Sequence, residues 1–206
     1  MRKKWGDALY DRDEQRAMKR QAVLRAGARL FHERGYEQTF LDDIAAELGV
    51  SKPSLYYYVK NKEEILYEVV QASLAMATAA FDVADREGAS GREKALIFFR
   101  QYVDHLFSDF GKCAAGVDIR ALDAQLEGRI LAVRHDIDRR VRAYVQEGQR
   151  DGSIQGSDAV LTTYYVFGAL NWIGQWHRGG AARDPQEVSR AFLELTERLL
   201  ASPPTS

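Results

Sequence analysis

Two short helical segments lie so close together between residues 39 and 61 that the chain joining them can only make a tight turn. The first segment ends at Gly49, and only Val50 separates that glycine from Ser51, which has the side chain of a helix cap. Pro53 suits the first turn of the second helix, where its missing N–H does no harm. The apolar residues of the first segment have helical spacing: Leu41, Ile44, Ala45 and Leu48. The stretch therefore predicts a helix-turn-helix.

Further start and stop signals predict helices on both sides of this motif. Residues 14–34 form an amphipathic pattern closed by Gly35, and Thr39, with Asp42 three residues later, is the expected cap of the following helix. Later helices are predicted over residues 61–84 (capped by Asn61), 92–110, 118–125 and 127–150, after a cap at Ser157, and after a cap at Asp184 followed by Pro185. The sequence has no strand-like alternation of useful length, so the predicted fold class is all-α.

The charge of the chain is divided unevenly. Residues 1–62 contain 13 Lys and Arg against 9 Asp and Glu, a net charge of +4, whereas residues 63–206 carry 16 against 21, a net charge of −5. Because only the basic part attracts a polyanion, we expect that part alone to contact nucleic acid. The predicted organisation is a three-helix, helix-turn-helix domain over residues 1–62, with residues 1–13 as an N-terminal arm, and a larger helical domain over residues 63–206.

Other features of the sequence limit its compartment and chemistry. A single cysteine, Cys113, excludes an internal disulfide and a Cys-rich zinc site. The charged N-terminus lacks the apolar core of a signal peptide. Residues 159–177 carry no Asp, Glu, Lys or Arg, but polar residues interrupt them, so we predict a buried helix rather than a membrane span. The four histidines are scattered and no enzyme fingerprint is present. We expect a cytoplasmic protein with no catalytic residue, metal, cofactor or membrane partner.

Three consecutive tyrosines follow the start of the second motif helix. Leu55 and Val59, four residues apart, form the stripe that faces the domain core. Tyr57 then points nearly opposite to the core, and Tyr56 and Tyr58 lie on either side of it. A tyrosine hydroxyl can donate to phosphate while its ring packs against a sugar or a thymine methyl. The triplet is therefore predicted to be a DNA-facing surface.

Polar contacts to DNA are expected at the starts of three helices. Lys52, Pro53 and Ser54 begin the second motif helix, whose N-terminal residues meet base edges in the major groove. Lys62 lies in the first turn of the next helix, where backbone N–H groups and the helix dipole favour a phosphate, and Thr39 offers a further phosphate anchor. The alternative is a structural role for each residue: caps for Thr39 and Ser51, core for Tyr58, and solvated charges for Lys60 and Lys62.

Residues 15–66 resemble the N-terminal domain of TetR-family transcriptional regulators, since a helix ending in FHERGYEQT is followed by IAAELGVSKPSLYYYVKNKEEIL. The resemblance implies an all-helical homodimeric repressor that binds a near-palindromic operator, with a larger ligand-binding domain whose last two helices form the dimer interface. The positions that contact operator DNA in relatives are occupied here by Ser51, Lys52, Ser54, Tyr56, Tyr57, Tyr58 and Lys62. One departure is Leu41-Asp42, where relatives often carry a threonine or a basic residue. Asp42 repels a phosphate unless it acts as a cap.

The inducer is expected among the aromatic residues of the C-terminal region. Aromatic side chains together with a few polar groups are typical of a ligand pocket between helices. The same residues are also typical of a hydrophobic core or of a dimer interface. The candidate ligand-binding residues are Phe99, Tyr102, Tyr165, Asn171, Trp172, Trp176 and Arg178. The string NWIGQWHR is similar to the NW...QW ending of some TetR-family regulators of fatty-acid and steroid breakdown, which respond to acyl-CoA thioesters. Candidate cations for the CoA phosphates are Arg178, Arg134 and Arg120.

The sequence leaves three alternatives open. The inducer could be a different small apolar or aromatic compound of the multidrug type. The aromatic cavity could serve a small all-helical enzyme, against which the missing catalytic motifs argue. The tyrosine face could bind another protein, as exposed aromatics often do.

Overall fold

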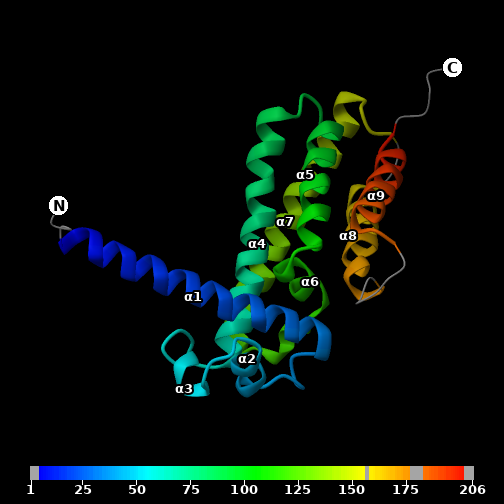
Figure 1. The fold of residues 1–206 in the computed structure, drawn as a ribbon. Helices are drawn as coiled ribbons and strands as arrows, with labels where there is room; N and C mark the ends of the chain where they lie inside the picture. The colour runs from blue at the N-terminus through cyan, green and yellow to red at the C-terminus, as the bar shows by residue number, and fades with distance from the viewer. Residues whose placement is uncertain (1–4, 156–157, 177–182, 202–206) are drawn as a thin grey trace.

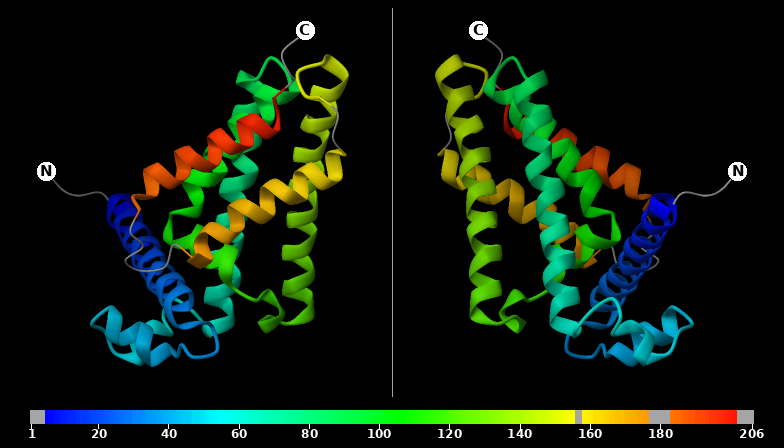
Figure 2. Two further views of the ribbon diagram at one scale, coloured as in Figure 1. Left: turned by 90° about the vertical axis from the view of Figure 1, so that its right-hand side faces the viewer. Right: turned by 90° about the vertical axis from the view of Figure 1, so that its left-hand side faces the viewer.

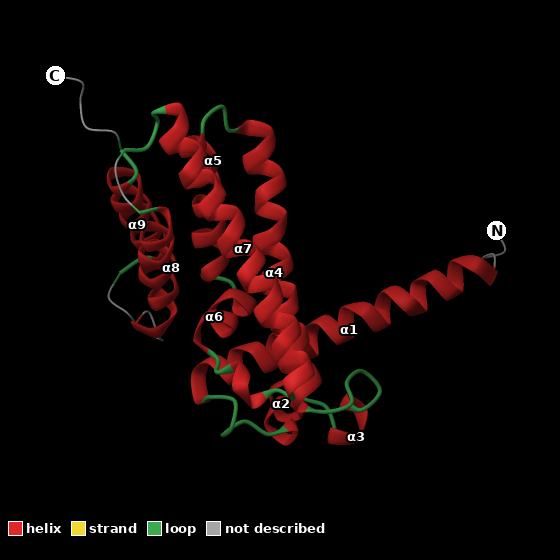
Figure 3. Cartoon of the chain, turned by 180° about the vertical axis from the view of Figure 1, so that it is seen from behind, coloured by secondary structure: helices red, strands yellow, loops and turns green. Residues whose placement is uncertain are grey.

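The computed structural model describes the backbone of residues 5–155, 158–176 and 183–201, and the side chains of residues 12–155, 158–174 and 183–201. Within these ranges every regular element is a helix and there is no strand (Figure 3), which confirms the all-α prediction. The helices are α1 (Trp5–Arg34), α2 (Leu41–Glu47), α3 (Lys52–Leu55), α4 (Lys62–Glu87), α5 (Gly91–Leu106), α6 (Asp109–Gly116), the 3-10 helix η1 (Ile119–Ala121), α7 (Ala124–Asp151), α8 (Ala159–Trp176) and α9 (Pro185–Leu199).

The helices form a small head and a larger body (Figure 1). The head contains α2, α3 and the C-terminal half of α1, while the N-terminal half of α1 projects away from the rest of the molecule. In the body, α4, α5 and α7 run side by side and the short α6 lies between them and the head. Helices α8 and α9 cover one side of this bundle (Figure 2).

Helix α4 belongs to two hydrophobic cores. Its first half packs with α1, α2 and α3 through Ile65 and Val69, and its second half packs with α5, α7, α8 and α9 through Phe81. Leu74 contacts both cores. Helix α6 also packs into the head core, through the buried Cys113 and Ala114. Head and body are therefore linked by two helices, and the expected domain boundary after residue 62 stays a prediction.

Several capping predictions are confirmed. The Asn61 side chain accepts a hydrogen bond from the Glu64 N–H (2.7 Å), and α4 begins directly after Asn61. Asp184 caps α9, with Pro185 in its first position. Gly49 ends α2 in the left-handed region, with φ of 64°, a conformation that glycine adopts without steric cost.

Other boundaries differ from the prediction. Helix α1 begins at Trp5, so most of the expected arm is helical. The helix predicted over residues 92–110 ends at Leu106, because Ser108 accepts from the Gly111 N–H and starts α6. The segment predicted near residues 118–125 contains the short η1 and the start of α7. Ser157 lies outside the described residues, and the Asp158 side chain accepts from the first N–H groups of α8.

The membrane question concerns α8, whose sequence carries no charged residue. Neither α8 nor any other helix in the described part of the chain has the length and apolarity needed to cross a bilayer. The prediction that this segment is a buried helix is correct for only one of its faces. One face of α8 is buried through Val166, Leu170 and Ile173, whereas the opposite face is exposed.

Candidate nucleic-acid interface and ligand cavity

The turn between α2 and α3 is held by backbone hydrogen bonds. The Gly49 N–H donates to the Ala46 carbonyl (3.1 Å) and the Val50 N–H donates to the Ala45 carbonyl (3.0 Å). Ile44 and Ala45 from α2 and Leu55 from α3 are buried against the rest of the head. The predicted helix-turn-helix is therefore formed, and its orientation on the head is fixed by packing.

The tyrosine triplet does not continue α3 as regular helix. Helix α3 ends at Leu55, and the next three residues form a turn, although the Val59 N–H still donates to the Leu55 carbonyl (3.0 Å). Leu55 and Val59 are both buried, as the spacing predicted. The Tyr57 side chain is 76% exposed, Tyr56 is exposed, and Tyr58 packs partly against the head core. The two rings that leave the core share the surface next to α3.

The start of α3 presents polar groups on the same surface. The hydroxyls of Ser51 and Ser54 share a hydrogen bond (2.8 Å), and Pro53 is exposed in the first turn. The Lys52 ammonium donates to the Asp42 carboxylate (2.9 Å), and this hydrogen bond raises the pKa of Lys52. An exposed pair of this kind contributes little to stability, so phosphate can replace the carboxylate as the partner of Lys52.

Two of the predicted phosphate anchors have structural partners. The Thr39 hydroxyl is fully buried and donates to the carbonyl of Gly35 (2.8 Å), so the expectation that it contacts phosphate is wrong. Thr39 is not the cap of α2 either, because that position belongs to Phe40, whose N–H donates to Asp43 (2.7 Å). Asp42 is consequently free of the capping role and pairs with Lys52.

Lys62 occupies the first turn of α4, as predicted, but it faces the loop that follows α1. Its ammonium donates to the Tyr36 carbonyl (2.8 Å) and lies 4.1 Å from the centre of the Tyr36 ring. This contact ties the start of α4 to the head. A direct phosphate contact by Lys62 stays a prediction.

An arginine that the sequence did not single out supports the tyrosine turn. Arg20 of α1 donates from Nε to the Tyr58 carbonyl (3.1 Å) and pairs with Glu64 (2.9 Å) and with Glu68. The hydrogen bond with Glu68 is the main cause of the raised pKa of Arg20. These partners lie 38 to 48 residues away from Arg20, so no local sequence signal could identify them.

A cavity of about 200 Å³ lies inside the body, between α4, α5, α6, α7 and α8. The Tyr102 hydroxyl donates to Asn171 (2.6 Å) at its wall, and burial raises the pKa of Tyr102 to about 12. Arg134 of α7 also lines the cavity and donates to the Ala114 carbonyl of α6 (3.1 Å), and burial lowers the pKa of Arg134. The cavity therefore combines apolar walls with an amide, a phenol, a hydroxyl, a cation and the carboxylate of Asp138.

The predicted ligand-binding residues do not all meet at this cavity. Tyr102 and Asn171 line it, whereas Phe99 is buried in the body core against the ring of Phe167 (5.6 Å between centroids). Tyr165 and Trp172 are 68% and 65% exposed on the outer face of α8, so their predicted place in the pocket is wrong. The side chain of Trp176 and the whole of Arg178 lie outside the described residues. Sequence reasoning missed Phe167 and Asp138 as lining residues.

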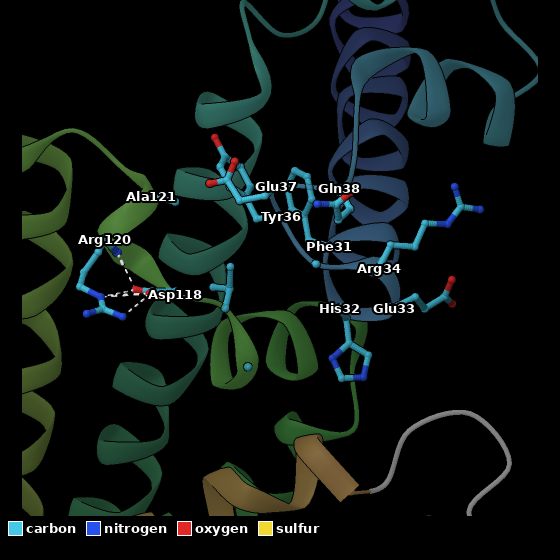
Figure 4. A pocket seen from close by; sticks show the side chains of 13 residues that line it. Phe31, His32, Glu33, Arg34, Tyr36, Glu37, Gln38, Asp118, Arg120 and Ala121 are labelled. Atoms are coloured by element: carbon cyan, nitrogen blue, oxygen red, sulfur yellow. Dashed lines mark hydrogen bonds and ion pairs between the residues drawn. The ribbon is translucent and has the colours of Figure 1, made fainter.

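A second hollow, of about 690 Å³, lies where head and body meet (Figure 4). His32 and Tyr36 line it from the head, and Asp118 and Arg120 line it from the body, where they pair with each other (2.5 Å). Because acidic and basic groups alternate around it, this hollow has no net preference for an anion. Arg120 forms an exposed pair with Asp118 there, and its contact with a CoA phosphate stays a prediction.

Metal-binding and thiol chemistry have no evident site among the side chains that the structure describes. No group of three or more His, Cys, Asp or Glu residues is arranged there to hold a metal ion. Cys113 is buried in the head core, and burial raises its pKa to about 12. It packs as a small apolar side chain.

Two parts of the chain match known protein-family domains. Residues 23–69 match the bacterial regulatory proteins of the tetR family, and residues 88–200 match the tetracyclin repressor-like C-terminal domain. The chain belongs to the TetR family. Members of the TetR family are DNA-binding transcriptional regulators, and the matched residues 23–69 include the helix-turn-helix formed by α2 and α3.

Individual relatives agree with the family assignment. The fatty acid metabolism regulator protein of Bacillus subtilis (strain 168) is 23% identical over 185 residues, which are 88% of this chain and 95% of the relative. The crystal structure of the TetR family regulator PfmR from Thermus thermophilus is 31% identical, with a TM-score of 0.75 over 87% of this chain and 99% of that one. AibR in complex with isovaleryl coenzyme A and operator DNA has the same fold, with a TM-score of 0.74 at 19% identity over 85% of this chain and 96% of that one.

Proposed function

We propose that this TetR-family protein is a repressor that binds a near-palindromic operator as a homodimer and is released by a small hydrophobic ligand. The observation that carries operator recognition is the Tyr57 ring, which is 76% exposed beside α3 while Leu55 and Val59 anchor the same turn in the core. A large aromatic side chain exposed next to the helix that enters the major groove is suited to contact DNA.

The exposed face of α8 supports a homodimer. Leu161, Tyr165, Gly168 and Trp172 follow one another by four, three and four residues, so they form one stripe along the helix. The three large side chains of this stripe are exposed, as are Leu195 and Leu199 of α9. Exposed apolar side chains that cluster on a helix face often mark a protein–protein interface. Pairing of α8 and α9 with a second copy would cover these side chains and supply two α3 helices for two half-sites.

The cavity supports an acyl-CoA inducer with a short acyl group. One relative regulates fatty acid metabolism and a structural neighbour binds isovaleryl coenzyme A together with DNA. The cavity volume of about 200 Å³ is below the roughly 300–1,000 Å³ of pockets for drug-sized ligands. A short branched chain suits this volume better than a long chain or a steroid. Arg134 and the Tyr102–Asn171 pair offer hydrogen bonds to the thioester carbonyl or a nearby polar group.

Release of DNA requires a ligand that prefers a conformation with wrongly spaced heads. The cavity is lined by Gly111, Ala114 and Ala115 of α6, and the same helix packs into the head core through Cys113. A ligand that displaces α6 therefore acts directly on α1, besides acting through α4. A 100-fold loss of operator affinity needs about 2.7 kcal/mol of coupling, which is an ordinary magnitude for allostery.

The proposal can be tested with operator fragments recovered from genomic DNA that the protein binds. Fluorescence anisotropy should show that isovaleryl-CoA raises the operator Kd about 100-fold, whereas CoA alone, palmitoyl-CoA and a steroid acyl-CoA have weaker effects. Tyr102→Phe should reduce the response to isovaleryl-CoA without changing the Kd of the ligand-free protein. Tyr57→Ala should weaken operator binding while the dimer stays folded.

The ligand class, operator binding and the role of Tyr57 can each be refuted without refuting the others. If no acyl-CoA releases the DNA, the ligand class is wrong and operator binding stands. If no specific DNA binding is found even at low salt, the repressor function is wrong. Equal operator affinity for Tyr57→Ala and the wild type would remove Tyr57 from the interface.

A further inference from the structure

The projecting half of α1 carries a cationic face beside the tyrosine turn. All side chains from Arg12 to Lys19 are exposed, and α3 with its following turn lies beneath this half of α1 (Figure 1, Figure 3). A groove of about 410 Å³ runs between the two. It is lined by Arg12, Gln15, Arg16 and Lys19 from α1 and by Tyr57 and Tyr58 from the turn.

The spacing of the α1 residues places their side chains on one side of the helix. Arg12, Arg16 and Lys19 are separated by four and three residues, which is the repeat of a single helical face. Asp13 and Glu14 are displaced from Arg12 by about 100° and 200° around the helix, and neither lines the groove. The groove thus contains three cations, two phenols and no carboxylate.

Several cations of the head, unlike those of the groove, are paired with carboxylates. Arg20, Arg29, Arg34 and Lys52 each pair with a carboxylate. Among the side chains that the structure describes, Arg12, Arg16 and Lys19 have no such partner. Three unpaired cations around one concave surface produce a local field that attracts an anion.

We propose that this groove binds the phosphate backbone of DNA next to the segment that α3 contacts, with Arg12, Arg16 and Lys19 as positioning residues. The proposal rests on the DNA binding of the family and adds a contact that the helix-turn-helix does not provide. From residue 12 to residue 19 the helix rises by about 10 Å, roughly three nucleotide steps of 3.4 Å along one strand. Tyr57 borders both the groove and the surface of α3, so one ring joins the two contacts.

Phosphate contacts can be distinguished from base contacts by the salt dependence of the DNA affinity. Each neutralised phosphate releases counterions, so the slope of log K against log salt concentration changes by about 0.9 per contact on duplex DNA. Loss of such a contact weakens binding to all sequences by a similar factor. A role of α1 in placing α3 alone would instead reduce the preference for the operator and leave the slope unchanged.

The experiment measures the Kd of two 40-base-pair duplexes, one carrying the operator selected by the full-length protein and one of random sequence, from 50 to 300 mM KCl. Arg16→Ala should lower the slope by about 0.9 and Arg12→Ala/Arg16→Ala by about 1.8, with equal fold losses on both duplexes. Arg16→Lys should retain most of the wild-type slope. Arg100→Ala removes an exposed arginine of α5 in the body and should bind both duplexes like the wild type.

Circular dichroism and sedimentation check that each variant keeps the wild-type fold and assembly, which is expected because the replaced side chains are exposed. Wild-type slopes and affinities in the Arg12→Ala/Arg16→Ala protein would overturn the proposal. It is also overturned by a loss confined to the operator at constant slope, or by a groove that recruits an acidic protein but not DNA. A wild-type protein that binds neither duplex would instead refute the DNA-binding function itself.

Discussion

The His105 ring joins three helices of the body. Its Nε2 shares a hydrogen bond with the Ser73 hydroxyl of α4 (2.8 Å), and its Nδ1 shares a weaker one with Ser108 (3.3 Å), which caps α6. Burial lowers the pKa of His105 below its ordinary value. The folded protein therefore keeps this imidazole neutral under conditions in which the unfolded chain binds a proton.

Because the unfolded state binds a proton that His105 of the folded state does not bind, low pH favours unfolding. As pH falls through about 6.5, the ordinary value for histidine, the free energy of unfolding should decrease, by no more than about 1.4 kcal/mol per pH unit from this one group. His105→Gln should remove this part of the pH dependence. Urea unfolding between pH 5.5 and 7.5 measures it, and His135→Gln is the control for the loss of an exposed imidazole. The same pH slope in His105→Gln and in the wild type would contradict the prediction.

Helices α5 and α7 approach each other closely at a pair of glycines. A Cβ placed on Gly91 would lie 2.0 Å from the backbone nitrogen of Gly148 and 2.5 Å from the carbonyl oxygen of Tyr144. Both are backbone atoms, which cannot move without displacing α7. The Gly91 N–H also donates to Asp151 (2.8 Å), so the start of α5 is fixed at this position.

Gly91→Ala is therefore expected to destabilise the protein by about 3 kcal/mol, at the upper end of the usual cost of overpacking. Gly128→Ala is the matched control in α7, where nothing lies within 4 Å of the added methyl group. This substitution should stabilise the protein by about 0.5–1 kcal/mol, because alanine favours a helix more than glycine does. Urea unfolding measures both variants, and a Gly91→Ala protein as stable as the wild type would show that the two helices can separate at little cost.

The elements also show which features can be predicted from sequence. Asn61, Asp184 and Gly49 act on N–H groups or turns within a few residues, so their roles could be predicted from their immediate neighbours. The role of Arg134 depends on a carbonyl that the fold brings to it, twenty residues away in the chain. The sequence singles out the aromatic residues of α8, but it does not show which of them face the core and which face solvent. Which face of α8 turns inward is decided by its packing against α6 and α7.

At the scale of the whole molecule, the proposed dimer would pair the exposed faces of α8 and α9 and so bring two heads together. The stripe on α8 has Tyr165 near its centre, and the exposed Leu195 and Leu199 of α9 provide further apolar surface. In the proposed interface, a carboxylate at the centre of the apolar stripe would be buried without a partner, which is costly. Tyr165→Glu should therefore yield a folded monomer.

Loss of the proposed dimer should weaken binding to the full operator but not to a half-site. A monomer contacts one half-site, so Tyr165→Glu should bind the full operator about 100-fold more weakly than the wild type, while both proteins bind an isolated half-site equally. Sedimentation velocity measures the assembly, and Leu131→Glu places the same charge on an exposed leucine of α7 as the control. A Tyr165→Glu protein that remains dimeric would place the interface elsewhere. A monomer with undiminished operator affinity would show that the two heads bind independently, and the operator would then have no need of fixed half-site spacing.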